Sequence, residues 1–188
     1  MERAQAPSPS ELPGRGESVT PPARLFRLHE RDRISVLVVG GTAARRLQVA
    51  HVFHRRSRLA RGPLVCLHAA RDEAALKGAL HAWMSATESR ATDPIATAEL
   101  GTLYIDSIAH LSPAVQRLLL EFSSRHLNAS EADFSRPWTG RLIAGDSHRL
   151  RAAVRAGAFS MALYDALDKV SIELPAHSPP SVVRRLTA

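Results

Sequence analysis

The strongest constraint on the fold comes from residues 36–54, where an apolar run meets two glycines and then a segment of helical periodicity. The stretch reads VLVVGGTAARRLQVAHVFH. The consecutive apolar residues before the glycines are typical of a strand that is buried on both faces of a sheet. After the glycines, Leu47, Ala50 and Phe53 recur at helical spacing and predict a helix over residues 43–58. The chain must therefore turn sharply between strand and helix.

The same glycines begin a spacing that is known from phosphate-binding loops. A working loop reads G-x-x-x-x-G-K, in which backbone N–H groups surround the phosphates and the Lys reaches the terminal ones. Here Gly40 occupies the first position, Arg45 stands at the second glycine and Arg46 at the lysine. Two arginines at a helix N-terminus are able to hold an anion. We favour the simpler interpretation, in which both are solvated side chains of the first turn.

Apolar runs and helical segments alternate along the rest of the chain, which indicates an α/β fold: a parallel five-stranded sheet with helices on both faces. Polar segments at 88–98 and 128–140 predict loops. The predicted strands are 34–39, 63–67, 101–106, 141–145 and 170–174. The predicted helices are 23–30, 43–58, 71–87, one that Ser112 caps with Pro113 in its first turn, 148–157 and 159–168.

Composition separates one globular domain from two tails. Residues 1–23 are rich in Pro and Ser and are expected to form a flexible tail, residues 24–175 the domain, and residues 176–188 a C-terminal tail. There is no run of about 18 apolar residues and no apolar leader, so we expect a cytoplasmic location. The single cysteine, Cys66, lies in an apolar run and is expected to be a small core residue in a reducing compartment.

The chain is basic, with a formal net charge of +7, and all of its 25 basic residues except Lys77 and Lys169 are arginines. Arginine suits bidentate phosphate binding, so nucleic acid is a candidate partner. Aromatic residues make up only 5% of the chain, which argues against a base-stacking surface. No Cys/His spacing fits zinc, and no metal site is predicted. The densest group of arginines has no acid within it and contains Arg45, Arg46, Arg55, Arg56, Arg58 and Arg61.

Several segments together resemble a known family. They are Val36–Gly40, Val49–Ser57 ending in HRRS, Gly62–Val65, Gly101–Asp106 reading GTLYID, Leu111–Gln116 reading LSPAVQ, and Leu150–Leu167. From about Arg33 to Pro175 the chain is similar to the AAA+ central domain of bacterial sigma-54-dependent transcription activators. The resemblance implies a P-loop NTPase fold, in which residues 101–106 are the Walker B strand and residues 150–167 surround the arginine fingers.

The positions that carry the family's ATPase chemistry depart from its pattern. Glycines of the phosphate loop are replaced at Ala43 and Arg45, and a Cβ is penalised wherever such a loop needs positive φ. Asp106, which in the family helps to hold Mg²⁺, is retained. The Glu that would follow it and activate water is Ser107, and a hydroxyl is no general base at neutral pH.

Other parts of the family's machinery are also changed. The arginine-finger positions hold Ser160 and Ala166, although such fingers contribute on the order of 10³-fold or more to phosphoryl transfer. The polar sensor, usually Thr-Asn, is Asp146 followed by Ser147. Segment 70–97 is short and lacks the Gly-Ala-Phe-Thr-Gly-Ala loop that grips sigma-54. We expect the helical lid and the helix-turn-helix to be absent as well.

These departures predict a pseudo-ATPase: a catalytically inactive module, without cofactor or metal, that regulates or scaffolds a bacterial signalling or transcription complex through a protein partner. Gly40, Arg46 and Asp106 are then vestigial positions. The first alternative is a residual nucleotide-binding ATPase that uses ATP and Mg²⁺ through Arg46 and Asp106. The second is a basic nucleic-acid-binding protein that uses the arginines at 45–58. Neither an ATP-driven hexamer nor membrane association is expected.

Overall fold

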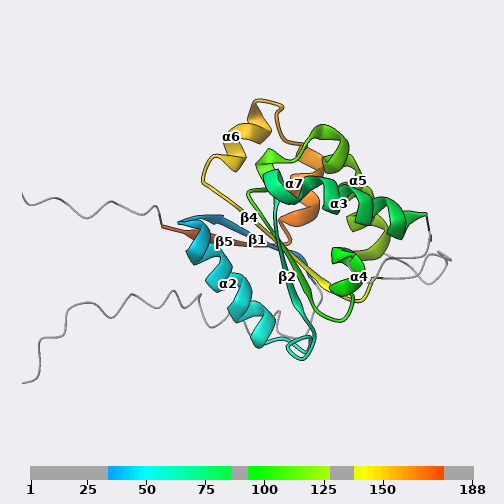
Figure 1. Cartoon of the computed structure of the whole chain (residues 1–188). Helices are drawn as coiled ribbons and strands as arrows, with labels where there is room; N and C mark the ends of the chain where they lie inside the picture. Colours follow the sequence, from blue (N-terminus) through cyan, green and yellow to red (C-terminus); the bar gives the residue numbers. More distant parts are fainter. Residues whose placement is uncertain (1–33, 86–92, 128–137, 176–188) are drawn as a thin grey trace, which may run out of the picture.

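The computed structural model describes residues 34–85, 93–127 and 138–175 (Figure 1). The strands are β1 (Val36–Gly40), β2 (Leu64–His68), β3 (Thr102–Asp106), β4 (Arg141–Asp146) and β5 (Val170–Leu174). The helices are α2 (Ala43–Arg55), α3 (Ala69–Met84), α4 (Pro94–Thr97), α5 (Pro113–Leu127), α6 (Leu150–Arg155) and α7 (Met161–Leu167), and the 3-10 turn η1 spans Ile108–His110. Within these described ranges, no helix combines the length and the apolar character that a membrane crossing requires.

The strands form one parallel sheet in the order β2-β3-β4-β1-β5, so the predicted five-stranded parallel sheet is confirmed. β4 lies between β1 and β3: Ile143 is the partner of Val36 on one side and of Tyr104 on the other. Because the strands are parallel, their carboxyl ends meet at one edge of the sheet. The chain segments that follow β1, β3 and β4 therefore converge there, at the edge where open α/β sheets bind ligands.

Helices cover both faces of the sheet, as predicted (Figure 1). On one face, α2 packs Val49 against Val36 and Val38 of β1. On the other face lie α3, α5 and α7, in the layer that also buries Leu37 and Val39. Successive side chains of a strand point to opposite faces, so a strand between two helical layers is apolar at every position. This explains the continuous apolar run with which the sequence begins the fold.

Two local predictions are wrong. Segment 88–98 is predicted as a loop, but its last part forms α4, in which Asp93 caps the first turn and Pro94 stands at the first helical position. Cys66 is predicted to be a core residue, but it is exposed because β2 is an edge strand of the sheet. An apolar run alone does not distinguish an edge strand from a central one.

The remaining predicted elements are present with shifted ends. The predicted helices 148–157 and 159–168 are shorter, because Gly157 adopts a φ of +72° after α6 and Ser160 caps α7. The predicted helix 71–87 begins two residues earlier, at Ala69. Some predictions lie outside the described residues: the tails 1–23 and 176–188, the helix 23–30, and positions 128–137 of the predicted loop.

Candidate functional site

Two glycines with positive φ build the turn between β1 and α2. Gly40 has a φ of +90° and Gly41 a φ of +56°, a region of the backbone map that favours glycine. A Cβ on Gly40 would collide with the ring of His148 and with the carbonyl oxygen of Leu174. The turn is therefore closed and tightly packed. Thr42 then caps α2, its hydroxyl accepting a hydrogen bond from a backbone N–H of the first turn at 3.3 Å.

Helix α2 begins at Ala43, so positions 43–46 are its first turn instead of an open loop. Every positive φ in this turn falls on a glycine. Ala43 and Arg45 adopt helical backbone angles, so neither residue has the positive φ at which a Cβ would be penalised. The helix has taken over the positions that a phosphate loop would use, which removes the need for glycine there.

Arg46 turns inward from this first turn and forms a bidentate ion pair with Asp106. Its Nε donates to Oδ1 at 2.7 Å and its Nη2 to Oδ2 at 3.0 Å. Its Nη1 donates to the carbonyl oxygens of Gly40 and Gly41, each at 3.1 Å. Arg46 is 6% exposed and Asp106 7%, so the interpretation of Arg46 as a solvated arginine is wrong. The vestigial positions bind one another.

Tyr104 and Gly145 complete this group, although neither belongs to the positions predicted for the site. Tyr104 lies two residues before Asp106 on β3, faces the same side of the sheet, and donates to Oδ1 at 2.8 Å. Gly145 lies beside them on β4, where a Cβ would come within 2.6 Å of the Tyr104 hydroxyl. The two-residue spacing is a signal that could have found Tyr104. We call Arg46, Asp106 and Tyr104 the buried ion-pair cluster.

The buried ion-pair cluster holds its charges firmly. Burial disfavours the charged forms, but hydrogen bonds and attraction between Arg46 and Asp106 outweigh it. The pKa of Asp106 is therefore lowered and the pKa of Arg46 is raised. Burial and the neighbouring carboxylate raise the pKa of Tyr104, whose hydroxyl stays a donor. At neutral pH the cluster contains one cation and one anion and carries no net charge.

Comparisons with known proteins identify the family of this domain. The sequence pattern of the sigma-54 interaction domain matches residues 14–173. The chain belongs to this family. It is 32% identical over 147 residues to the transcriptional regulatory protein ZraR of Escherichia coli K12, covering 75% of this chain and 33% of that protein. It is 31% identical over 184 residues to the anaerobic nitric oxide reductase transcription regulator NorR of Aeromonas salmonicida, covering 91% and 36%. The chain thus spans about a third of the length of these curated relatives.

Solved structures share the fold of this sigma-54 interaction domain. NtrX from Brucella abortus in complex with ADP superimposes with a TM-score of 0.63 at 21% identity, covering 81% of this chain and 36% of that chain. The P-loop NTPase domain of the sigma-54 transport activator from E. coli superimposes with a TM-score of 0.55 at 22% identity, covering 80% and 98%. The likeness concerns the fold alone, and it confirms the P-loop NTPase, AAA+ fold that the resemblance implies.

In this sigma-54 interaction domain, the residues at the carboxyl ends of β3 and β4 are held in structural contacts. Ser107 has a φ of +59°, and its hydroxyl lies 3.4 Å from Oδ2 of Asp106. Asp146 is buried and accepts hydrogen bonds from the N–H groups of Ala109 at 2.7 Å and Ser147 at 2.6 Å. It therefore fixes η1 to the end of β4. Among the described residues, no three His, Cys, Asp or Glu side chains lie close enough to hold a metal ion.

The two positions that hold arginine fingers in the family serve helix α7 in this chain. The Ser160 hydroxyl accepts the N–H of Leu163 at 3.3 Å and caps the helix. The Ser160 N–H donates to Oε1 of Gln116 at 2.8 Å and so ties α7 to α5. Ala166 lies within α7 and has no polar side chain. Neither position presents a guanidinium.

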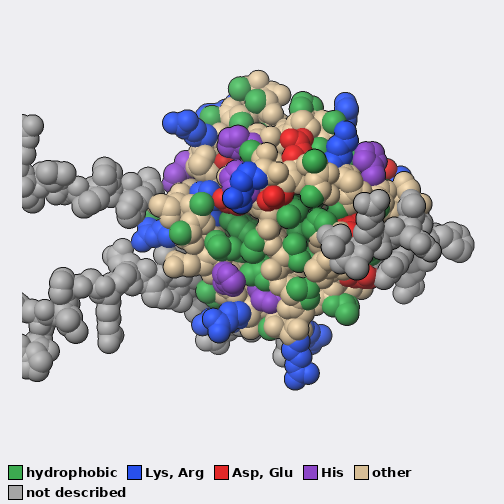
Figure 2. Space-filling view, viewed as in Figure 1, with side chains coloured by type: hydrophobic (Ala, Val, Ile, Leu, Met, Phe, Trp, Pro, Cys, Tyr) green, Lys and Arg blue, Asp and Glu red, His purple; other side chains and the backbone are tan. Residues whose placement is uncertain are grey.

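The arginine-rich stretch is only partly a surface. Arg55, Arg56 and Arg58 are exposed and Arg45 is half-buried, whereas Arg46 belongs to the buried ion-pair cluster. Figure 2 shows most Lys and Arg side chains at the margin of the visible face and one basic group inside it, beside acidic and His side chains, with apolar atoms gathered near the middle, where Figure 1 places β2. On this face the basic residues form no single continuous patch. Pairing with Asp106 thus removes Arg46 from the positive charges available to a nucleic acid.

Proposed function

We propose that this chain is a catalytically inactive sigma-54 interaction domain that acts as a regulatory or scaffolding module in bacterial signalling or transcription. One observation carries the proposal. The side chain at the position of the phosphate-loop lysine, Arg46, is bonded on all sides to Asp106 and to the carbonyl oxygens of Gly40 and Gly41. An internal cation thus stands where a bound nucleotide would place its phosphates and metal.

The donor set at this site does not fit Mg²⁺ with a nucleotide. Mg²⁺ is coordinated by carboxylate oxygens together with phosphates and water. Both oxygens of Asp106 already accept hydrogen bonds from Arg46, and Oδ1 also accepts one from Tyr104. A metal would have to displace a buried guanidinium. The metal and the guanidinium are both positive, so they would also repel each other across the same carboxylate.

The positions that perform hydrolysis in the family hold other residues in this chain. Ser107 cannot take a proton from water at neutral pH as a carboxylate does. Ser160 and Ala166 supply no positive charge to a transferring phosphoryl group. These replacements support loss of turnover independently of whether any nucleotide binds.

The second candidate is a residual nucleotide-binding ATPase, and one observation favours it. NtrX, which shares this fold, has been crystallised with ADP and with ATP. In this candidate Arg46 would swing out of the buried ion-pair cluster when nucleotide arrives and release Asp106 for Mg²⁺. This movement would break the buried bidentate ion pair between Arg46 and Asp106. Only a strongly bound nucleotide could offset that loss of stability.

Phosphate release from Mg-ATP separates the two candidates. We expect the purified chain to release phosphate no faster than buffer, while an active domain of the same family serves as the positive control. The Asp106→Ala variant is the matched negative control for traces of contaminating ATPase. A rate that exceeds the buffer rate and disappears in Asp106→Ala would establish the residual ATPase and overturn the proposal.

Partner binding and assembly follow from the same proposal. Without arginine fingers at Ser160 and Ala166, nucleotide cannot organise a subunit interface through them. We therefore expect light scattering to give the same molecular mass with and without Mg-ATP, and the chain to act through contacts with another protein in the bacterial cytoplasm. A hexamer that forms only with nucleotide would contradict this part of the proposal.

A further inference from the structure

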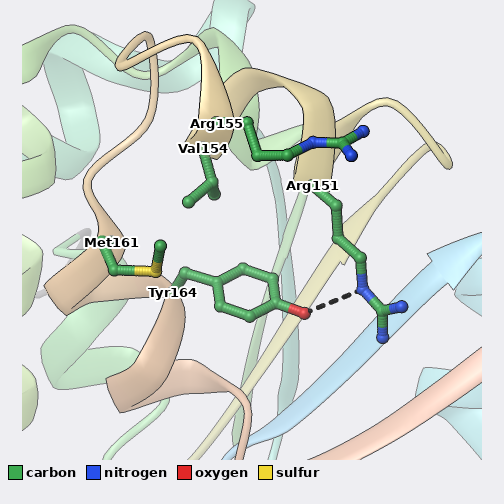
Figure 3. A pocket seen from close by; sticks show the side chains of 5 residues that line it. All are labelled: Arg151, Val154, Arg155, Met161 and Tyr164. Carbon is green, nitrogen blue, oxygen red and sulfur yellow. Dashed lines mark hydrogen bonds between the residues drawn. The ribbon is translucent and has the colours of Figure 1, made fainter.

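A pocket between α6 and α7 lies outside the buried ion-pair cluster. It is about 310 Å³ in volume and is lined by Arg151, Val154, Arg155, Met161 and Tyr164. Figure 3 shows Val154, Met161 and the ring of Tyr164 converging on a common space, with both arginine side chains extending on the side of the Tyr164 hydroxyl. The pocket thus has an apolar wall and a basic rim.

Hydrogen bonds hold one side of this pocket in place. Nε of Arg151 donates to the hydroxyl of Tyr164 at 3.2 Å, and Nη2 of Arg151 lies 3.0 Å from a carboxylate oxygen of Glu173 on β5. These two contacts connect Arg151 on α6 with the Tyr164 hydroxyl on α7 and with β5. These contacts raise the pKa of Arg151, so the rim keeps its charge. The Tyr164 hydroxyl and Arg151 thus lie in contact at this side of the pocket.

The two arginines of the rim differ in their acidic neighbours. Arg151 and Arg155 are four residues apart on α6, which places their side chains on the same face of the helix, and like charges at this spacing repel. Glu173 pairs with Arg151, and the charge of Asp168 also acts on Arg151. For Arg155, the described part of the chain supplies no carboxylate within ion-pair distance. An anion at the rim would relieve the repulsion and pair with Arg155.

We propose that this pocket binds a compact apolar molecule that carries a carboxylate or a phosphate. The anionic group accepts hydrogen bonds from Arg155, whose planar guanidinium is suited to either oxyanion. The apolar body lies against Val154, Met161 and the ring of Tyr164. Methionine adapts its shape to different ligands, so Met161 sets a tolerant apolar wall, and the charged head supplies the specificity.

The dimensions favour a small molecule over a protein surface. Pockets for small ligands begin at about 300 Å³ and are mostly apolar with a few placed polar groups. A stable protein interface needs a total of roughly 1,200 Å² or more, far beyond the surface that these side chains offer. The lining residues belong neither to the phosphate-loop turn nor to the buried ion-pair cluster. The proposal therefore stands whether or not the chain binds ATP.

Chemical-shift mapping on the ¹⁵N-labelled full chain tests this site with three probes of similar body. They are 3-phenylpropionate, phenyl phosphate and the neutral 3-phenylpropanamide. We expect at least one anion to move the amide signals of residues 150–167 saturably below about 10 mM, and the amide to bind at least tenfold more weakly. The better anion identifies the head group. No saturable shift with either anion, or equal binding of the amide, would overturn the proposal.

Two exposed side chains supply variants that keep the fold. Arg155→Gln should weaken the better anion about tenfold or more, because a charged hydrogen bond is replaced by a neutral one. Met161→Gln should weaken it less, through the apolar body alone. Arg58→Gln removes an exposed arginine outside the pocket and should leave the affinity unchanged. Equal losses in Arg155→Gln and Arg58→Gln would show attraction to overall charge only and would contradict the assigned site.

Discussion

Replacing Asp106 by Asn leaves the Arg46 guanidinium buried without its counter-charge. The two charged atoms lie 2.7 Å apart, so their attraction is about 6 kcal/mol at an effective dielectric constant of about 20. Part of this loss is offset, because a neutral amide at position 106 costs less to bury than a carboxylate. Removal of one partner of a buried pair costs about 3–5 kcal/mol. With a urea m-value of about 1–3 kcal/mol per molar, the unfolding midpoint should fall by about 1 M or more.

The exposed pair Arg125–Glu121 is the matched control, since its side chains are 47% and 46% exposed at 2.6 Å. Glu121→Gln should change the free energy of unfolding by less than about 0.5 kcal/mol. Adding Arg46→Met to Asp106→Asn should recover about 2 kcal/mol, because the unpaired cation is removed. If Asp106→Asn is as stable as the parent chain or more stable, the carboxylate is an open, hydrated group, and the reasoning that assigns it to a closed cluster is refuted.

Three further changes probe the turn, the cluster and the face that α2 covers. Gly40→Ala should lower the free energy of unfolding by at least about 1 kcal/mol, because Gly40 has a φ of +90° and an added Cβ would collide with neighbouring atoms. The control Gly78→Ala adds a Cβ in open space within α3. It should raise the free energy of unfolding by about 0.5–1 kcal/mol in the same urea assay. Tyr104→Phe should cost about 1 kcal/mol and raise the pKa of Asp106, measured by NMR titration; an unchanged pKa would contradict the hydrogen bond. The pKa of His54 is lowered by burial and by the charge of a neighbouring histidine, so the unfolded chain binds the proton more readily and stability is lost as the pH falls below about 6.5. His54→Gln should flatten the difference between urea midpoints at pH 7.5 and 5.5, and an unaltered difference would refute this assignment.

The strands could be predicted because burial on two faces requires a continuous apolar run in the sequence. In β1 every residue contacts one helical layer or the other, so the run from Val36 to Val39 has no polar interruption. The predicted helix ends are less accurate than the predicted strands, because several residues near each end, such as Gly157 and Ser160, are able to end or cap a helix. Exposure of Cys66 could not be predicted, because it depends on the strand order, and the edge strand β2 is nearly as apolar as the central strands.

The candidate site illustrates the same limit. The sequence singles out Gly40, Arg46 and Asp106 individually, through their spacing and through the resemblance. It does not reveal that they bond to one another, because Arg46 and Asp106 are 60 residues apart and a strand lies between β1 and β3. Local rules alone therefore predict that the Arg46 side chain is solvated. The contact depends on sheet topology and on the space that Gly145 leaves, and no local pattern encodes either.

Titration calorimetry with Mg-ATP measures most directly whether the internal ion pair has replaced the nucleotide. If Arg46 has replaced the nucleotide, no binding tighter than about 1 mM is expected, which corresponds to a free energy of about −4 kcal/mol. NtrX from Brucella abortus, which has been crystallised with ATP, serves as the positive control under the same conditions. A micromolar dissociation constant that is lost in Asp106→Ala would contradict the account, because it would show that Arg46 yields its position to the nucleotide.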